Sequence, residues 1–149
     1  MRNLDKFSIV VDSNEFYHGN TWTFPGFSVS TKSLVEYGCD YSIRGLVGTV
    51  GVERKSYSDY IRCVGADWKR FQKQLAKLRR NKYHCVIVEG SLDDPINSYS
   101  RMVHEAVILR TAQIAITRMP IIFASTRLKA TSMCVNFMQA AIKKIRDSQ

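Results

Sequence analysis

Two short apolar runs on either side of a longer segment constrain the fold of this chain more than any other feature. Residues 84–89 read HCVIVE and precede Gly90, and residues 121–124 read IIFA and follow Pro120. Neither run alternates apolar with polar side chains, so both predict strands that are covered on both faces of a sheet. The intervening segment, about residues 100–117, predicts a helix. A strand, a helix and a second strand in this order indicate parallel pairing within an α/β sheet.

The N-terminal part of the chain predicts four more strands. An apolar run over residues 7–11 ends in polar turn residues, which mark the end of the first strand. Three stretches rich in β-branched and aromatic residues follow, and Gly38 and Gly48 separate them. These stretches are Val29–Glu36, Tyr41–Val47 and Thr49–Lys55. We expect them to form an antiparallel meander.

Two further segments predict amphipathic helices. The first has apolar residues three and four positions apart, at Trp68, Phe71, Leu75 and Leu78. Its other face is basic and carries Lys69, Arg70, Lys73, Lys77, Arg79 and Arg80. This face is either a phosphate-contacting surface or a solvated one. Its position relative to a binding site would decide between the two. The C-terminal segment has an apolar stripe at Leu128, Val135, Met138, Ile142 and Ile145, with further apolar residues beside it. The predicted fold is α/β, a mixed central sheet flanked by helices on both faces.

Length and composition indicate one globular domain over residues 1–149. The chain is 45% hydrophobic and 23% charged, which excludes wholesale disorder, and no repeat, low-complexity tract or linker divides it. Its four cysteines have neither disulfide-scaffold nor zinc spacing, so we expect reduced thiols in an intracellular protein of the cytoplasm, nucleoid or nucleus. We find no secretory leader and no apolar stretch long enough to span a bilayer.

The charge balance indicates a polyanionic partner. Twenty-two Lys and Arg residues against 13 Asp and Glu residues give a formal net charge of +9. Nucleic acid is the first candidate for such a partner, and an anionic membrane surface is the second.

Charged residues on two neighbouring predicted strands carry the strongest chemical signal. Glu53 and Lys55 are two residues apart and therefore point to the same face of their strand, and Asp40 starts the neighbouring strand. Two carboxylates beside an ammonium group suit Mg²⁺ or Mn²⁺, which engage phosphate oxygens. The lysine would orient or deprotonate a water molecule, or neutralise charge in the transition state. The pattern predicts phosphodiester hydrolysis, but it also fits a solvated strand face, and residues 56–59 also fit a helix N-cap.

Five motifs in order make the signal more specific. They are VVDSNEF at residues 10–16, CDY at 39–41, VERKSYSD at 52–59, VIVEGSL at 86–92 and PIIFAST at 120–126. Together they resemble the nuclease domain of the XPF/MUS/Hef family of structure-specific endonucleases. The signature of that family is G-D, a spacer and E-R-K-x-x-x-D, and the resemblance covers about residues 7–146. Asn14 and Cys39 depart from the family pattern, which usually has Arg and Gly at these positions.

The resemblance implies a restriction-endonuclease-like fold that cuts one DNA strand near a junction between duplex and single strand, with Mg²⁺ or alternatively Mn²⁺ as cofactor. It makes Asp40 and Glu53 metal ligands, Lys55 the catalytic lysine and Arg54 a charge-stabilising or positioning group. It also makes Asp59 an accessory acid.

Two more acidic residues in the first motif would border the same cleft. Asp12 is a third candidate metal ligand, and Asp12 and Glu15 would hold metal-bound water or orient Arg54. Glu89, at the end of a buried strand, is expected to be structural.

Members of the family pair through helices of the nuclease domain. The broad apolar stripe of the C-terminal helix therefore leads us to expect a homodimer through the last two helices, or pairing with a DNA-binding subunit. We find no helix-hairpin-helix or helicase module of the kind that family members carry. The leading hypothesis is a DNA endonuclease of DNA repair that acts on branched, flap or fork DNA. The alternatives are a catalytically silent DNA-binding scaffold subunit, and a Holliday-junction resolvase or nickase on the same fold.

Overall fold

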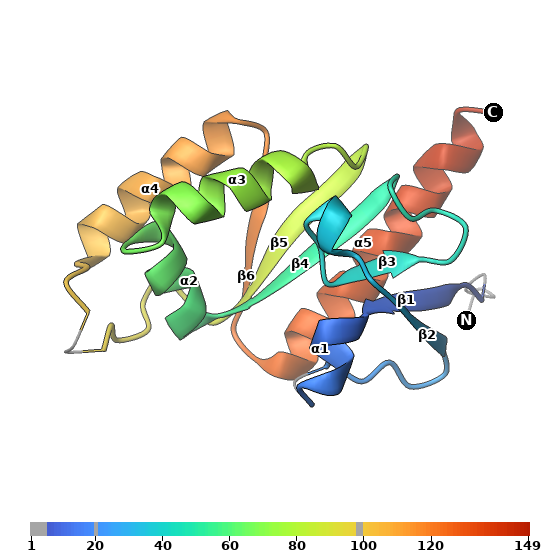
Figure 1. Ribbon diagram of the computed structural model, residues 1–149, viewed down its shortest axis with the longest axis horizontal. Helices are drawn as coiled ribbons and strands as arrows, with labels where there is room; N and C mark the ends of the chain where they lie inside the picture. The colour runs from blue at the N-terminus through green and yellow to red at the C-terminus, as the bar shows by residue number, and fades with distance from the viewer. Residues whose placement is uncertain (1–5, 20, 98–99) are drawn as a thin grey trace.

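A mixed β-sheet forms the centre of the molecule, and helices cover both of its faces (Figure 1). The computed structural model describes residues 6–19, 21–97 and 100–149. Within these residues the strands are β1 (Ser8–Asp12), β2 (Ser28–Lys32), β3 (Tyr41–Ile43), β4 (Val50–Ser56), β5 (Tyr83–Glu89) and β6 (Ile121–Ala124). Their order across the sheet is β2-β1-β3-β4-β5-β6. β3 is antiparallel to its neighbours β1 and β4, and the other pairs are parallel. The prediction of a mixed sheet flanked by helices is confirmed.

The helices form one layer on each face of the sheet. They are α1 (Ser13–Tyr17), α2 (Tyr57–Val64), α3 (Trp68–Leu78), α4 (His104–Ile116) and α5 (Arg127–Asp147), with a 3-10 turn η1 (Val35–Tyr37). α2, α3 and α4 pack on one face, and α5 packs on the other. Among the described helices, none combines the length and the apolar character needed to cross a membrane.

The N-terminal strands differ from the predicted meander. Of Val29–Glu36, only the part within β2 is a strand, and it pairs in parallel with β1 at the exposed edge of the sheet. The connection from β1 to β2 runs through α1 and a long loop, and a connection of this length allows the two neighbouring strands to be parallel. The antiparallel prediction is therefore wrong for β2 and correct for β3 and β4. The predicted strand Tyr41–Val47 shortens to β3 because Gly45 and Gly48 turn the chain with φ angles of 82° and 88°.

A side-chain cap sets the start of α2. The Oγ atom of Ser56 accepts a hydrogen bond from the backbone N–H of Asp59 (3.2 Å), so residue 56 caps α2 while it also ends β4. Gly65 then separates α2 from α3. The helix predicted over residues 100–117 begins at His104, later than expected.

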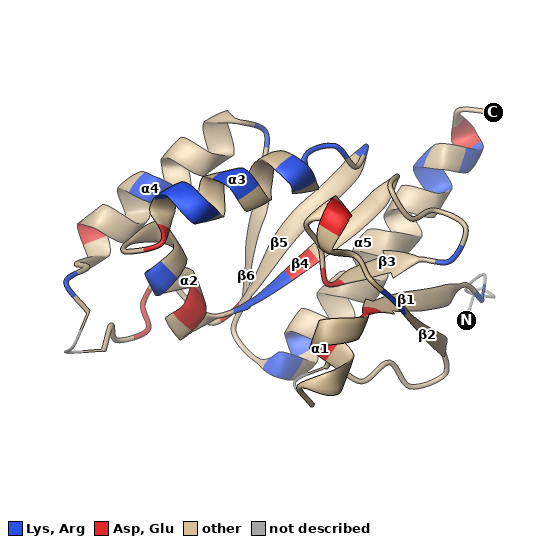
Figure 2. Ribbon diagram, in the orientation of Figure 1, with Lys and Arg blue, Asp and Glu red and all other residues tan. Residues whose placement is uncertain are grey.

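β4 sends successive side chains into opposite layers of the molecule. Val50 and Val52 are buried in the core beneath α5. Because side chains alternate along a strand, Arg54 points into the α5 layer, whereas Glu53 and Lys55 point toward α2 and α3. Figure 2 shows a red acidic stretch followed by a blue basic stretch along β4. This alternation creates two separate charged clusters.

Candidate active site

Asp40 is held by backbone hydrogen bonds to the strands on both sides. Its N–H donates to the carbonyl of Val52 (3.0 Å), and its carbonyl accepts from the N–H of Asp12 (2.7 Å). Its Oδ2 atom accepts from the backbone N–H of Arg54 (2.9 Å). Gly38 permits this placement, because its φ is 65° and an added Cβ would lie 2.9 Å from backbone atoms of α3. The loop before Asp40 therefore packs tightly against α3 and brings the carboxylate to β4.

Glu53 and Lys55 meet Asp40 on the α2–α3 side of the sheet. The Nζ atom of Lys55 lies 3.1 Å from Oε1 of Glu53, whose side chain is almost fully buried. The side chains of Asp40 and of Gln74 on α3 also lie near the Glu53 carboxyl group and help to lower its pKa. Nζ of Lys55 lies 5.7 Å from the ring centroid of Phe71 on the same helix. We call Asp40, Glu53 and Lys55 the acidic site.

The positive charge of Lys55 only partly compensates the two carboxyl groups of the acidic site. Burial raises the pKa of Asp40 well above its usual value, and the nearby carboxylates of Glu53 and Glu15 raise it further. Burial also raises the pKa of Glu53, and the charge of Lys55 offsets only part of this effect. Burial alone would lower the pKa of Lys55, but the charge of Glu53, the hydrogen bond to it and the charge of Asp40 contribute to a combined effect that outweighs burial, so the pKa of the lysine is raised. The lysine is therefore an ammonium group at neutral pH, and an added cation would stabilise both carboxylates.

Arg54 forms the second cluster, in the α5 layer. Its Nη1 atom lies 2.7 Å from Oε1 of Glu15, and its Nε atom lies 2.8 Å from Oε1 of Glu89. The indole N–H of Trp22 also donates to Glu89, and the Trp22 ring centroid lies 5.6 Å from the guanidinium carbon. Although burial raises the pKa of Glu89, the hydrogen bonds from Trp22 and Arg54 lower it overall. We call Arg54, Glu15, Glu89 and Trp22 the arginine clamp, which joins α1 and the Trp22 loop to the ends of β4 and β5.

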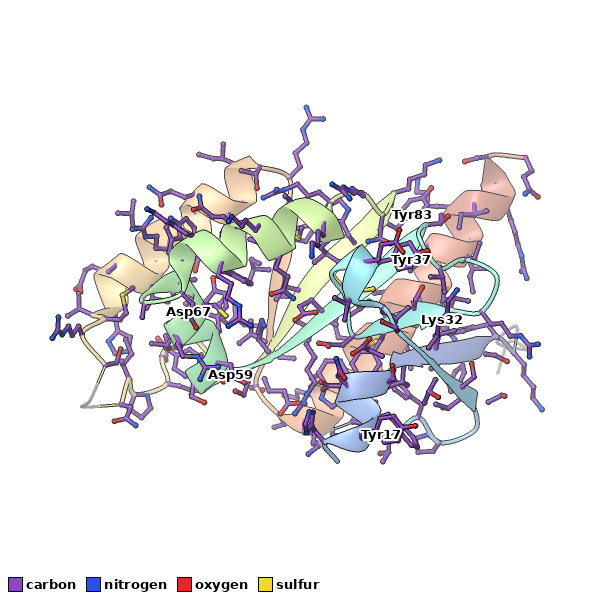
Figure 3. The ribbon with its side chains drawn as sticks, viewed as in Figure 1. Tyr17, Lys32, Tyr37, Asp59, Asp67 and Tyr83 are labelled. Atoms are coloured by element: carbon purple, nitrogen blue, oxygen red, sulfur yellow. The ribbon has the colours of Figure 1, made fainter. Side chains whose placement is uncertain are left out.

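Two predicted site residues have other partners. Asp12 is buried, and its Oδ1 and Oδ2 atoms accept backbone N–H bonds from Leu34 (2.6 Å) and Asn14 (3.2 Å). It is therefore the N-cap of α1. Asp59 lies in the first turn of α2 (Figure 3), where its half-exposed carboxylate is 3.1 Å from Nη2 of Arg62. Within the described chain, neither carboxylate has a hydrogen bond or ion pair to a side chain of the acidic site.

The donor set of the acidic site is small. Over the residues that the structure describes, no three His, Cys, Asp or Glu side chains gather closely enough to hold a metal ion by themselves. A groove of about 1150 Å³ lies elsewhere, between α2, α4 and residues 95–97 and 100–102, and its described walls include none of the acidic-site residues. The chemistry of the residues, and not the size of a cavity, therefore identifies the candidate site.

The sequence matches the family model of the ERCC4 domain over residues 8–137. The chain belongs to the ERCC4-domain family. This finding confirms the resemblance to the XPF/MUS/Hef nuclease domain, because the ERCC4 domain is a nuclease family.

Two similar solved structures agree with this family on the fold. The structure of XPF from Aeropyrum pernix in complex with DNA has a TM-score of 0.68 and 20% sequence identity, over 93% of this chain and 66% of that one. Another structure of XPF from Aeropyrum pernix has a TM-score of 0.68 and 17% identity, over 90% of this chain and 61% of that one. The chain thus spans about two thirds of the length of these XPF chains, and its fold is the restriction-endonuclease-like fold of the ERCC4 nucleases. A comparison with curated proteins finds no match.

Sequence reasoning missed parts of both clusters. Trp22 lies in an irregular loop, and no periodic pattern connects it to Arg54. Gln74 flanks the apolar stripe of α3, and a single neutral amide there carries no signal. Glu89 did carry a sequence signal, because it ends a strand that is parallel to β4, where it pairs in register with Ser56. The expectation of a structural role for Glu89 left out its contact with Arg54.

Proposed function

We propose that this chain is a metal-dependent endonuclease that hydrolyses phosphodiester bonds of DNA at branched, flap or fork structures. The acidic site is the single observation that most supports the proposal, because two neighbouring carboxyl groups meet an ammonium group on the strand with the E-R-K signature. XPF from Aeropyrum pernix forms a complex with DNA, which supports DNA as the substrate here.

The residues of the acidic site fit a divalent cation such as Mg²⁺, or Mn²⁺. Mg²⁺ prefers oxygen ligands, takes one or two carboxylates from a protein, and leaves other positions for water and phosphate. Asp40 and Glu53 supply two such carboxylates, and their pKa values are raised because Lys55 offsets only part of the effect of burial. Asp12 remains the third candidate, because each of its oxygens keeps a lone pair beyond its backbone bond. When bound, the metal would polarise the phosphate and activate water.

The two cations on β4 have different proposed roles. The ammonium group of Lys55 lies beside Glu53, so it would face a phosphate bound at the acidic site and stabilise the charge that develops there. Arg54 is engaged by two carboxylates in the other layer, so its geometry supports a positioning role. With Glu15, it would hold α1 and the end of β4 in place beside the acidic site.

Cleavage of labelled flap, fork and nicked duplexes with Mg²⁺ tests this function. Asp40→Asn and Lys55→Ala should each reduce the rate by about 10²–10³-fold, as expected for loss of one electrostatic contributor. The matched control is Lys143→Gln/Lys144→Gln, which removes exposed charge from the far end of α5 and should cut like the parent. Equal rates in the parent and both site variants would indicate a contaminating nuclease and refute the proposal.

A catalytically silent DNA-binding subunit is the second candidate function. The observation in its favour is that both oxygens of Asp12, the third predicted ligand, already accept backbone N–H bonds, one from Asn14 in α1 and one from Leu34. Binding of fork DNA without any cutting in Mg²⁺ or Mn²⁺ would support this candidate.

We also propose that two copies pair through exposed apolar side chains of α4. Ile108, Leu109 and Ile116 are 53–83% exposed there, and Leu128 at the start of α5 is 82% exposed. Exposed apolar residues gathered on one helix are typical of protein interfaces. Sedimentation should therefore give a dimer for the parent and a monomer for Leu109→Lys/Ile116→Lys. A parent that stays monomeric at high concentration would exclude the homodimer and leave pairing with a DNA-binding subunit.

A further inference from the structure

The basic face of α3 lies beside the acidic site. The side chain of Gln74, in the middle of α3, lies near Glu53 and helps to lower its pKa, and the ring centroid of Phe71 lies 5.7 Å from Nζ of Lys55. The loop before Asp40 packs against the same helix, since the Cβ position of Gly38 is 2.9–3.0 Å from Gln74, Lys77 and Leu78. The helix is therefore one wall of the acidic site.

Four exposed cations run along the outer surface of this wall. We call them the basic stripe: Arg70, Lys73, Lys77 and Arg80. The first three are spaced three and four residues apart, so they share one face of the helix, and Arg80 follows just beyond its end. Arg70 and Lys77 are each about one turn from Gln74, a spacing that puts neighbouring Cβ atoms about 5–6 Å apart. The stripe thus runs past the acidic site, with Gln74 between its two ends.

The charge of this segment is unbalanced. Residues 68–82 contain seven of the 22 Lys and Arg residues and no Asp or Glu (Figure 2). A merely solvated helix face normally mixes both signs and forms pairs three or four residues apart. Among the ion pairs of the described residues, none involves the basic stripe. Its charges are free to meet an external polyanion.

We propose that the basic stripe binds the phosphates of a duplex arm of the DNA and directs the strand into the acidic site, an inference that rests on the proposed nuclease function. The eleven residues of α3 span about 16 Å at 1.5 Å per residue, a length that matches about five phosphates of one strand. The helix offers no free aromatic ring for stacking on bases, because Phe71 is buried and the guanidinium of Arg110 lies 4.4 Å from the ring centroid of Trp68. Single-strand sites normally combine charge with such rings, so the stripe fits a duplex.

The salt dependence of DNA binding tests this inference. Anisotropy of a labelled duplex in metal-free buffer, which prevents cutting, would be measured from 50 to 300 mM salt. Removal of two phosphate contacts by Lys73→Gln/Lys77→Gln should reduce the slope of log K against log salt by about 1.8, which corresponds to about 60-fold weaker binding at 0.1 M if affinities are equal at 1 M. Lys143→Gln/Lys144→Gln, with the same charge change in the other layer, should bind like the parent. Affinity for a single strand of the same length should change less than threefold in both variants.

Several outcomes would overturn the inference. They are an unchanged slope in Lys73→Gln/Lys77→Gln, an equal loss in the α5 control, or an equal loss on single-stranded DNA. Cleavage separates this inference from the proposed function. If the parent never cuts DNA but Lys73→Gln/Lys77→Gln still reduces the salt slope, the basic stripe is supported and the nuclease function is refuted. If the parent cuts DNA and the variant keeps the parent's slope, only the role of the basic stripe is refuted.

Discussion

The acidic site and the arginine clamp have similar composition but opposite electrostatics. Each combines two carboxyl groups with one cation, and consecutive residues of β4 supply the cations. In the clamp, Arg54 reaches both carboxylates within 2.8 Å, and the pKa of Glu89 is lowered. In the acidic site the cation reaches Glu53 at 3.1 Å, yet the pKa values of both carboxyl groups are raised.

The difference is the one we expect between a structural cluster and the proposed functional site. A guanidinium with several donors satisfies two carboxylates at once, which an ammonium group does not do as well. The clamp therefore contributes to stability, whereas the acidic site stores unfavourable charge that only a bound cation or proton relieves. Perturbed carboxyl groups of this kind are typical of functional sites.

The largest expected effect on stability comes from the clamp. Arg54→Met should lower the free energy of unfolding by about 3 kcal/mol, because it leaves two largely buried carboxylates without their partner. Urea titration followed by circular dichroism would measure the change. The double variant Arg54→Met/Glu89→Gln should recover part of the lost stability, since it removes one of the two carboxylate charges left without a partner. A loss below 0.5 kcal/mol would show that the clamp is only a surface pair.

Asp12 provides the next prediction, because its carboxylate serves the fold whether or not it also binds metal. Asp12→Ala should cost about 2 kcal/mol, since it removes the cap of α1 and leaves the buried N–H of Leu34 without an acceptor. Asp12→Asn retains one oxygen acceptor and should cost less than half as much. If Asp12→Asn folds like the parent but loses cutting, Asp12 is a ligand. If it folds and cuts like the parent, the carboxylate acts only as the cap.

The acidic site should respond in the opposite direction. Asp40→Asn should raise stability by about 0.5–2 kcal/mol at pH 7 in buffer with a chelator, because it replaces a carboxylate whose ionisation the fold opposes. Its Oδ1 atom can still accept from the N–H of Arg54.

The pH dependence of this effect has a definite sign. The folded pKa of Asp40 is raised, so the unfolded chain loses this proton first and the stability of the parent falls as the pH rises above about 3.9. The advantage of Asp40→Asn should therefore vanish below that pH and grow above it. Thermal melts from pH 3 to pH 8 would measure it, and an advantage equally large at pH 3 would contradict the electrostatic explanation.

Much of the acidic site could be predicted from sequence because its geometry is local. Alternation on one strand places Glu53 and Lys55 on the same face. The turn at Gly45 and Gly48 lets β3, which follows Asp40 directly, pair antiparallel with β4 and brings Asp40 beside them. The same alternation predicts that Arg54 faces away, but its carboxylate partners come from α1 and the end of β5, 39 and 35 residues distant. No local pattern specifies such pairings.

The edge strand shows the same limit in the fold. Its β-branched residues predicted a strand correctly, but the parallel pairing of β2 with β1 depends on the path of the loop between them. Loop paths depend on tertiary packing, here the contact of Trp22 with Tyr41, whose ring centroids are 5.0 Å apart. The position of α3 beside Glu53 likewise required the structure.

Asp59 should give the smallest effect, and it marks the outer limit of the acidic site. Its carboxylate is half exposed and pairs with Arg62 within one turn of α2, a contact worth about 0.3–0.5 kcal/mol. Asp59→Asn should therefore change the free energy of unfolding by less than 0.5 kcal/mol. As an accessory acid without direct contact with Asp40 or Glu53, it should lower the cleavage rate by less than tenfold, far less than Asp40→Asn. A loss as large as that of Asp40→Asn would mean that α2 moves when DNA binds and brings Asp59 to the reacting phosphate, so that the acidic site is completed only in the complex.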